Sequence, residues 1–200
     1  MRLTEIRIAG FGGQGVILAT QILGRAAAIF DGAHATMTQS FGPEARGGAC
    51  SAQLIISDEA VLYPYVTQAD VLVAMSQEAF SKFSGEVKHG GLLLVERDLV
   101  RIDEMPEGVR VYGVPATRIA EKLGKRVVQN IVMLGFFAAI TKLVSIAALE
   151  KAVLGSVPAH LVEINRQALR SGLEVGETCL SQASPNGECD AIPEFTAWVE

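Results

Sequence analysis

Apolar residues recur along most of the chain with the alternating periods of strands and helices. Polar and apolar residues alternate over 4–9, which predicts a strand, and an alanine-rich stretch over 16–30 predicts a helix. The same criteria predict further helices at 76–83 and 115–123 and further strands at 33–39, 50–56, 70–75, 92–95 and 109–114. Strands alternating with helices are typical of an α/β fold with a doubly wound, mostly parallel, Rossmann-like sheet.

Strand pairing can also be predicted from the pattern. The first two predicted strands and the helix between them are expected to form a βαβ unit. Residues 61–64 are expected to add an antiparallel edge strand by pairing with the strand at 50–56. The strand at 70–75 is apolar on both faces, which is typical of a central parallel strand.

The last third of the chain has a helical pattern. Helices are predicted at 130–143, 145–154 and 158–171, and they would form a C-terminal helical layer over the sheet. The apolar stretch at 131–149 has Lys142 near its middle, which costs about 2.5–3.5 kcal/mol in a bilayer and favours a buried helix. Residues 1–172 are therefore expected to form a single domain. The more polar segment 173–200 is predicted to be an extended or partly disordered tail that could dock through Phe195 and Trp198.

Composition narrows the class of protein. Of 200 residues 50% are hydrophobic, and 17 basic against 22 acidic residues give a net charge of −5, which disfavours a general nucleic-acid or anionic-membrane binder. Cys50, Cys179 and Cys189 form no CxxC pair, so no zinc or iron–sulfur site is predicted. A disulfide scaffold is not expected at this length, and the N-terminus does not read as a signal peptide. The expected location is therefore cytoplasmic.

A glycine-rich loop, GFGGQG at 10–15, joins the first predicted strand to the first predicted helix. Its glycines match the GxGxxG spacing of dinucleotide-binding turns, where bare backbone approaches a phosphate at a helix N-terminus. NAD binding also requires a carboxylate at the carboxyl end of the second strand. That end reads TQS at 38–40, and Asp31 lies before the strand, so the pattern disfavours NAD.

Gln14 places a side-chain amide inside this loop. An amide both donates and accepts hydrogen bonds, which suits a partner backbone or a ligand amide better than a bare phosphate. Two interpretations of the loop stay open on these grounds. It is either a tight strand–helix turn that binds nothing, or a contact for an anion or a partner chain.

A second loop, SFGPEARGG at 40–48, follows the second predicted strand. Loops at the carboxyl ends of neighbouring parallel strands meet over one crevice, so this loop is expected beside the glycine loop. Arg46, followed by Gly47 and Gly48, could bring a guanidinium and backbone N–H groups onto one anion, with Glu44 holding the arginine. A surface loop with a local ion pair is the alternative.

Four motifs occur in a fixed order: GFGGQG at 10–15, SFGPEARGG at 40–48, ISD at 56–58 and NIVMLG at 130–135. Together they resemble the gamma subunit of the 2-oxoacid:ferredoxin oxidoreductases over about residues 6–172, as one gamma-type domain. The TQS that precedes FGPEARGG is most similar to the 2-oxoglutarate branch. The tail from Gly176 departs from the gamma pattern, and nothing is inferred for it.

The resemblance implies a subunit of an enzyme complex that converts a 2-oxoacid, coenzyme A and oxidised ferredoxin, or another acceptor, into acyl-CoA, carbon dioxide and reduced acceptor. Thiamine diphosphate, magnesium and iron–sulfur clusters would lie on partner subunits. Those partners would be alpha and beta subunits and, in some complexes, a ferredoxin-like delta subunit. The chain has no GDG motif and no cysteine cluster, in keeping with a subunit that does not carry out catalysis alone.

The resemblance also implies a role in assembly and in shaping the coenzyme A side of the site. The residues expected at coenzyme A or at the subunit interface are Gly12, Gly13, Gln14, Ser40, Arg46, Gly47 and Asn130. Asn130 is expected to cap a helix beside the two loops. No side chain is expected to be catalytic or to bind a metal. The alternative from another class is a stand-alone regulatory module that binds a nucleotide with the loop at 10–15.

Overall fold

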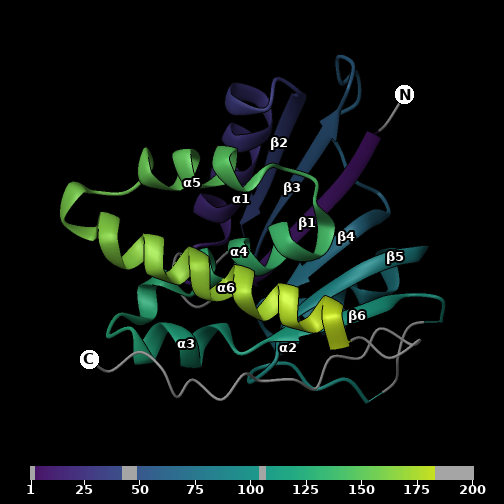
Figure 1. Ribbon diagram of the computed structural model, residues 1–200. Helices are drawn as coiled ribbons and strands as arrows, with labels where there is room; N and C mark the ends of the chain where they lie inside the picture. Colours follow the sequence, from purple (N-terminus) through teal and green to yellow (C-terminus); the bar gives the residue numbers. More distant parts are fainter. Residues whose placement is uncertain (1–2, 42–48, 104–106, 183–200) are drawn as a thin grey trace.

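The computed structural model describes residues 3–41, 49–103 and 107–182, which build a six-stranded sheet (Figure 1). The strands are β1 (Leu3–Phe11), β2 (His34–Phe41), β3 (Ala49–Ser57), β4 (Ala69–Ala74), β5 (Val87–Glu96) and β6 (Arg110–Val114). They lie in the order β2-β3-β1-β4-β5-β6. Strands β1, β4, β5 and β6 are parallel, whereas β3 is antiparallel to both of its neighbours.

The predicted fold class is confirmed: the sheet is mostly parallel, with an antiparallel pair, β2 and β3, at one edge. The expected adjacency of the first two strands is wrong, because β3 lies between them. It pairs with β1 without interruption from Leu3–Ser57 to Phe11–Ala49. Periodicity reports which face of a sheet a residue occupies, but it does not report which strand lies next to it.

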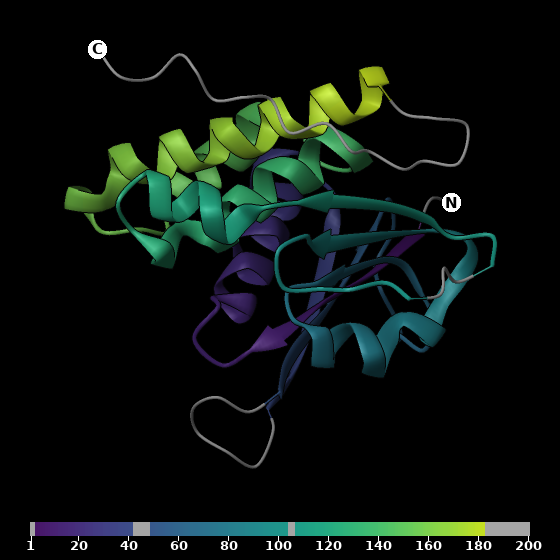
Figure 2. The same ribbon diagram turned by 90° about the horizontal axis from the view of Figure 1, so that it is seen from below.

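Helices cover the two faces of the sheet unequally, as Figure 2 shows. Helix α2 packs on one face, against β1 and β4, and the other helices lie on the opposite face. The α-helices are α1 (Val16–Arg25), α2 (Gln77–Phe83), α3 (Ala116–Lys122), α4 (Gln129–Thr141), α5 (Ile146–Leu154) and α6 (Val162–Gln182). A π-helical turn, η1 (Ala26–Phe30), prolongs α1, and short 3-10 turns lie at η2 (Ser84–Glu86), η3 (Arg126–Val128) and η4 (Ala159–Leu161).

Helix α4 is buried on every side, as its uniformly apolar sequence predicts. It lies beneath α6, and the two backbones touch at glycines. A Cβ atom at Gly172 would meet the carbonyl oxygen of Val132 and lie 2.9 Å from the nitrogen of Phe136. One at Gly135 would meet the carbonyl oxygen of Leu169. These glycines let α6 pack closely on α4 and cover this side of the core.

Two local predictions are wrong. Residues 61–64 form no strand, and the Leu62 side chain is 95% exposed. Helix α6 does not stop near 171 but continues to Gln182, because Gly172, Val175 and Gly176 keep a buried face at helical spacing. The first ten residues of the predicted tail are therefore helical, and Phe195 and Trp198 lie outside the described residues.

Candidate functional site

The carboxyl ends of the parallel strands lie along one side of the sheet, and the glycine loop lies on that side. It follows β1, beside Met75 at the end of β4. Strand β2, which leads into the second loop, ends on the same side, because Phe41 pairs with Cys50 and Cys50 pairs with Gly10. Strand β3 separates the two starting points, so they lie about 10 Å apart. The sequence therefore predicted the correct side of the sheet for the start of the second loop, although β1 and β2 are not adjacent.

Gly12 and Gly13, together with Phe11, form the exposed part of the glycine loop. Gly13 has a φ of 102°, a conformation that side chains disfavour, and no heavy atom lies within 4 Å of where its Cβ would be. Gly15 is the N-cap residue of α1 in the left-handed region, with a φ of 75°. The loop thus presents bare backbone at the start of a helix, as an anion-binding turn requires.

Gln14 differs from its predicted role, because its side chain points into the protein. Its Oε1 accepts a 2.6 Å hydrogen bond from the backbone N–H of Phe11, and its Nε2 donates one of 2.8 Å to the carbonyl of Met75. The residue is 9% exposed. Its amide therefore joins β1 to β4 and fixes the loop, and the expected contact with a ligand or partner amide is not supported.

Asn130 lies directly beneath the loop. It is 2% exposed, and its Nδ2 donates to the carbonyl of Gly15 over 3.3 Å. A Cβ atom at Gly15 would collide with this amide, since the Asn130 Cγ would be 2.8 Å away. Asn130 is the second residue of α4 rather than its cap, because the N-cap is Val128. The prediction that Asn130 adjoins the glycine loop is confirmed, and its capping role is corrected.

Two helices begin together at this point. Neither α1 nor α4 has a side-chain hydrogen bond at its N-cap, and Asn130 links their first turns. Each helix N-terminus carries roughly half a positive charge, so the pair favours an anion outside the loop. No acidic residue lies in the first turn of either helix.

A buried polar chain that sequence reasoning missed continues from α4 to β5. Thr117 Oγ1 donates to Gln129 Oε1 over 2.9 Å, and the Thr117 N–H donates to Glu96 Oε1 over 3.2 Å. Glu96 is 0% exposed, and this burial raises the pKa of its carboxyl. The only sequence feature that could have indicated these hydrogen bonds is Glu96, an acidic residue at the end of the apolar strand β5. The three hydrogen-bonded residues join β5, α3 and α4 behind the glycine loop.

The other predicted residues divide into two groups. Ser40 is exposed near the end of β2, on the same side of the sheet as the glycine loop. Arg46 and Gly47 lie outside the described residues. The structure thus brings Asn130 to the loop that contains Gly12, Gly13 and Gln14, through Gly15, and leaves Ser40 two strands away.

The described ranges contain no group of three or more His, Cys, Asp and Glu side chains that could hold a metal ion. No helix in them is long and apolar enough to cross a bilayer, and the stretch 131–149 is divided between α4 and α5. Cys179 is disulfide-bonded, a link that the cysteine spacing did not predict.

A family model matches the chain over residues 5–175, and the family is described as pyruvate ferredoxin/flavodoxin oxidoreductase. The chain belongs to this family. The 2-oxoglutarate synthase subunit KorC of Methanocaldococcus jannaschii is 50% identical over 175 residues, which cover 86% of this chain and 94% of KorC. The resemblance drawn from the four motifs is therefore confirmed.

Two further members of the family differ in length. The crystal structure of a keto/oxoacid ferredoxin oxidoreductase gamma subunit from Geobacter sulfurreducens matches with a TM-score of 0.78 and 44% identity, over 87% of this chain and 96% of that one. The ketoisovalerate oxidoreductase subunit VorA of Methanothermobacter marburgensis is 39% identical over 139 residues. The match covers 70% of this chain but 29% of VorA, so the domain there is part of a longer polypeptide.

Proposed function

We propose that this chain is the gamma subunit of a 2-oxoglutarate:acceptor oxidoreductase and helps to form the coenzyme A side of its active site. The observation that carries the proposal is the 50% identity to KorC along nearly the whole of that subunit. The gamma-type chain of Geobacter sulfurreducens supports the same subunit type. The alternative of a stand-alone nucleotide-binding regulator is not supported by these relatives.

The geometry of the glycine loop supports a contact with coenzyme A. Coenzyme A carries several phosphate groups, and two helix N-termini with exposed glycines favour an anion. Gly12 and Gly13 would approach a phosphate through their backbone, while Gln14 and Asn130 hold the loop from below. In the proposal Ser40, Arg46 and Gly47 belong to the same surface, with Arg46 supplying the positive charge.

The chemistry of the reaction is assigned to partner chains. Thiamine diphosphate with magnesium, and the iron–sulfur clusters that pass electrons to ferredoxin or another acceptor, would be bound by alpha and beta subunits and by a ferredoxin-like delta subunit where one is present. This chain would complete the complex and guide coenzyme A to the acyl intermediate. A cytoplasmic location stays a prediction.

The assembled complex tests this function. Co-expression of the chain with its partner subunits is expected to give reductase activity that depends on both 2-oxoglutarate and coenzyme A. Arg46→Ala is expected to raise the KM for coenzyme A by about tenfold, the value of one charge-assisted contact, with the KM for 2-oxoglutarate unchanged.

Arg110→Ala is the matched control, because Arg110 is an exposed arginine at the start of β6, on the opposite edge of the sheet. It is expected to leave both KM values unchanged. An assembled Arg46→Ala complex with wild-type kinetics would remove Arg46 from the coenzyme A surface. A chain that never co-purifies with oxidoreductase activity, and is instead stabilised by NADH, FAD or ATP, would overturn the subunit assignment.

A further inference from the structure

Strand β2 forms one edge of the sheet, and within residues 3–41, 49–103 and 107–182 no strand pairs with its outer side. It has eight residues, His34–Phe41, and its pairing with β3 is continuous from His34–Ser57 to Phe41–Cys50. Natural edge strands are blunted by lysines, other charges, prolines, bulges or shortness, because an open row of backbone groups recruits another strand. The sequence HATMTQSF has no proline, no lysine, arginine or carboxylate, and no bulge. Its outer side is therefore suited to pairing with a further strand.

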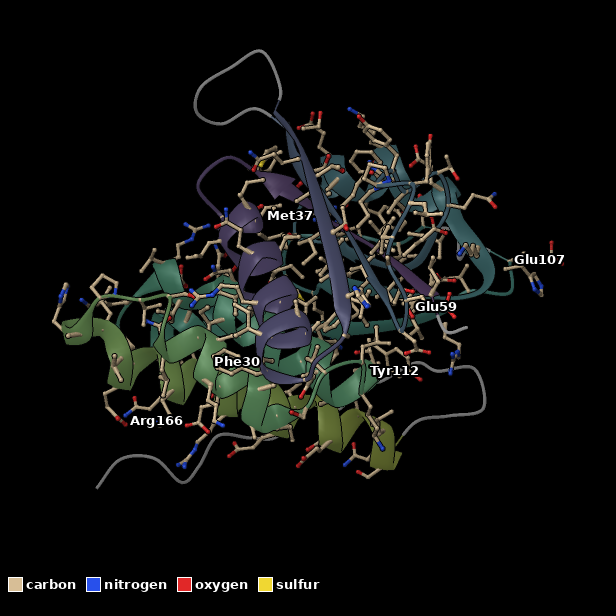
Figure 3. All side chains as sticks on the ribbon, turned by 90° about the horizontal axis from the view of Figure 1, so that it is seen from above. Phe30, Met37, Glu59, Glu107, Tyr112 and Arg166 are labelled. Atoms are coloured by element: carbon tan, nitrogen blue, oxygen red, sulfur yellow. The ribbon has the colours of Figure 1, made fainter. Side chains whose placement is uncertain are left out.

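A groove adjoins this edge. It has a volume of about 550 Å³ and is formed by α1 and η1 on one side and by β2 and β3 on the other. Figure 3 shows α1, η1 and β2 side by side, with Phe30 and Met37 labelled on them. The lining is mostly apolar and includes Leu18, Ala28, Ile29, Ala35 and Met37. Ile29 is 63% exposed and Leu18 is 37% exposed, so large apolar side chains face solvent beside the open strand.

Arg25 is the charged side chain that lines the groove. Its Nη1 donates to Ser156 Oγ over 2.9 Å and to the carbonyl of Gly155 over 3.5 Å, so the guanidinium is held at one end of the groove. Among the described residues it has no carboxylate partner. An occupant of the groove would therefore be mostly apolar, with a carboxylate opposite Arg25.

These features favour a different chain over a second copy of this one. Two copies paired through β2 would offer Arg25 no carboxylate from that strand. In VorA, the matching domain is 29% of the chain and is continuous with a larger polypeptide. In a complex whose subunits are separate chains, the corresponding neighbour would dock on a surface of this domain.

We propose that the β2 edge and the adjoining groove receive an extended segment of a partner subunit of the complex. The segment adds a strand to β2, places apolar side chains on Leu18, Ile29 and Met37, and pairs a carboxylate with Arg25. Backbone hydrogen bonds supply affinity, and the groove with Arg25 supplies selectivity. The inference rests on the proposed function, because the partner is taken from that complex.

Hydrogen exchange on the whole chain, free and in the reconstituted complex, tests the added strand. Outward-facing amides of β2 are expected to exchange fast in the free chain and to be at least about tenfold slower in the complex. Unchanged exchange over His34–Phe41 in an active complex would overturn the proposal and leave the proposed function intact.

Two variants test the groove in binding assays with the partner subunits. Ile29→Glu is expected to weaken assembly by at least about tenfold, the effect of losing an interface anchor. Arg25→Gln is expected to weaken it by about fivefold and to reduce its salt dependence. Leu62→Glu is the matched control, since Leu62 is an exposed leucine outside the groove lining, and it is expected to leave assembly unchanged.

Three further outcomes would overturn the proposal. Assembly of Ile29→Glu at wild-type strength would exclude the groove. A free chain that dimerises, and becomes monomeric on the Ile29→Glu change, would assign the edge to a second copy. Absence of any complex with wild-type chain would reject the proposed function, and the partner with it.

Discussion

The two edges of the sheet are built in opposite ways. Strand β6 has five residues, Arg110–Val114, begins with a charge, and has α6 packed against it. Strand β2 is longer, has no lysine, arginine or carboxylate, and adjoins an apolar groove. We call the β6 edge, against which α6 packs, the closed edge, and the β2 edge, whose outer side pairs with no strand of the described residues, the open edge. The difference supports the proposal that a neighbouring subunit completes the β2 edge.

The closed edge depends on glycines that seat α6 on α4, so substitution there should have the largest effect. Gly172→Ala is expected to destabilise the chain by about 3 kcal/mol and to lower Tm by about 10 °C, because the two backbones must separate. Gly85→Ala is the control, since nothing lies within 4 Å of its Cβ position. Equal melting temperatures for the two variants would refute the close helix contact.

The glycine loop lies between the two edges, and its support should be the next most sensitive. Gly15→Ala is expected to cost about 2 kcal/mol, because a Cβ atom meets Asn130 and the backbone is left-handed. Gly13→Ala also has a positive φ but open space, so it should cost about 1 kcal/mol. Chemical denaturation measures both. A Gly13 variant as unstable as the Gly15 variant would show that Asn130 contributes nothing.

The buried carboxyl of Glu96 makes the stability of the closed edge depend on pH, because Glu96 lies on β5 and pairs with Val114 of β6. Burial raises its pKa, so the folded chain keeps a proton that the unfolded chain releases. Wild-type stability should therefore fall as pH rises from the unfolded pKa through the raised folded pKa. Glu96→Gln removes this loss, so the Tm of the variant relative to wild type should rise as pH rises above the unfolded-state pKa of the carboxyl. A gap that shrinks with pH would contradict the sign.

The open edge should be the least sensitive in the isolated chain. Ile29→Glu is expected to change the free energy of unfolding by less than about 0.5 kcal/mol, because the side chain is mostly in water. Thermal melting of the free chain measures this, with Leu62→Glu as the reference. A large loss would mean that the groove is part of the core, and the contrast between the edges would fail.

Much of the fold could be predicted from the sequence because periodicity reports burial. The strand and helix patterns indicated the mostly parallel sheet, and the all-apolar residues 131–140 indicated the buried helix α4. The motif at 10–15 indicated a tight glycine turn at the start of a helix, and Gly15 is the N-cap residue of α1 there. These features are local, so neighbouring residues suffice to specify them.

Tertiary structure decided the features that join distant residues. The place of β3 between β1 and β2, the extension of α6 to Gln182 and the Glu96–Thr117–Gln129 hydrogen bonds all depend on contacts between elements that are distant in the sequence. It also decided the role of Gln14, whose amide suited an external ligand in sequence but binds Met75 in the fold. The sequence shows that the loop contains a polar side chain. Whether that group faces a ligand or the core depends on which strand end lies beside it.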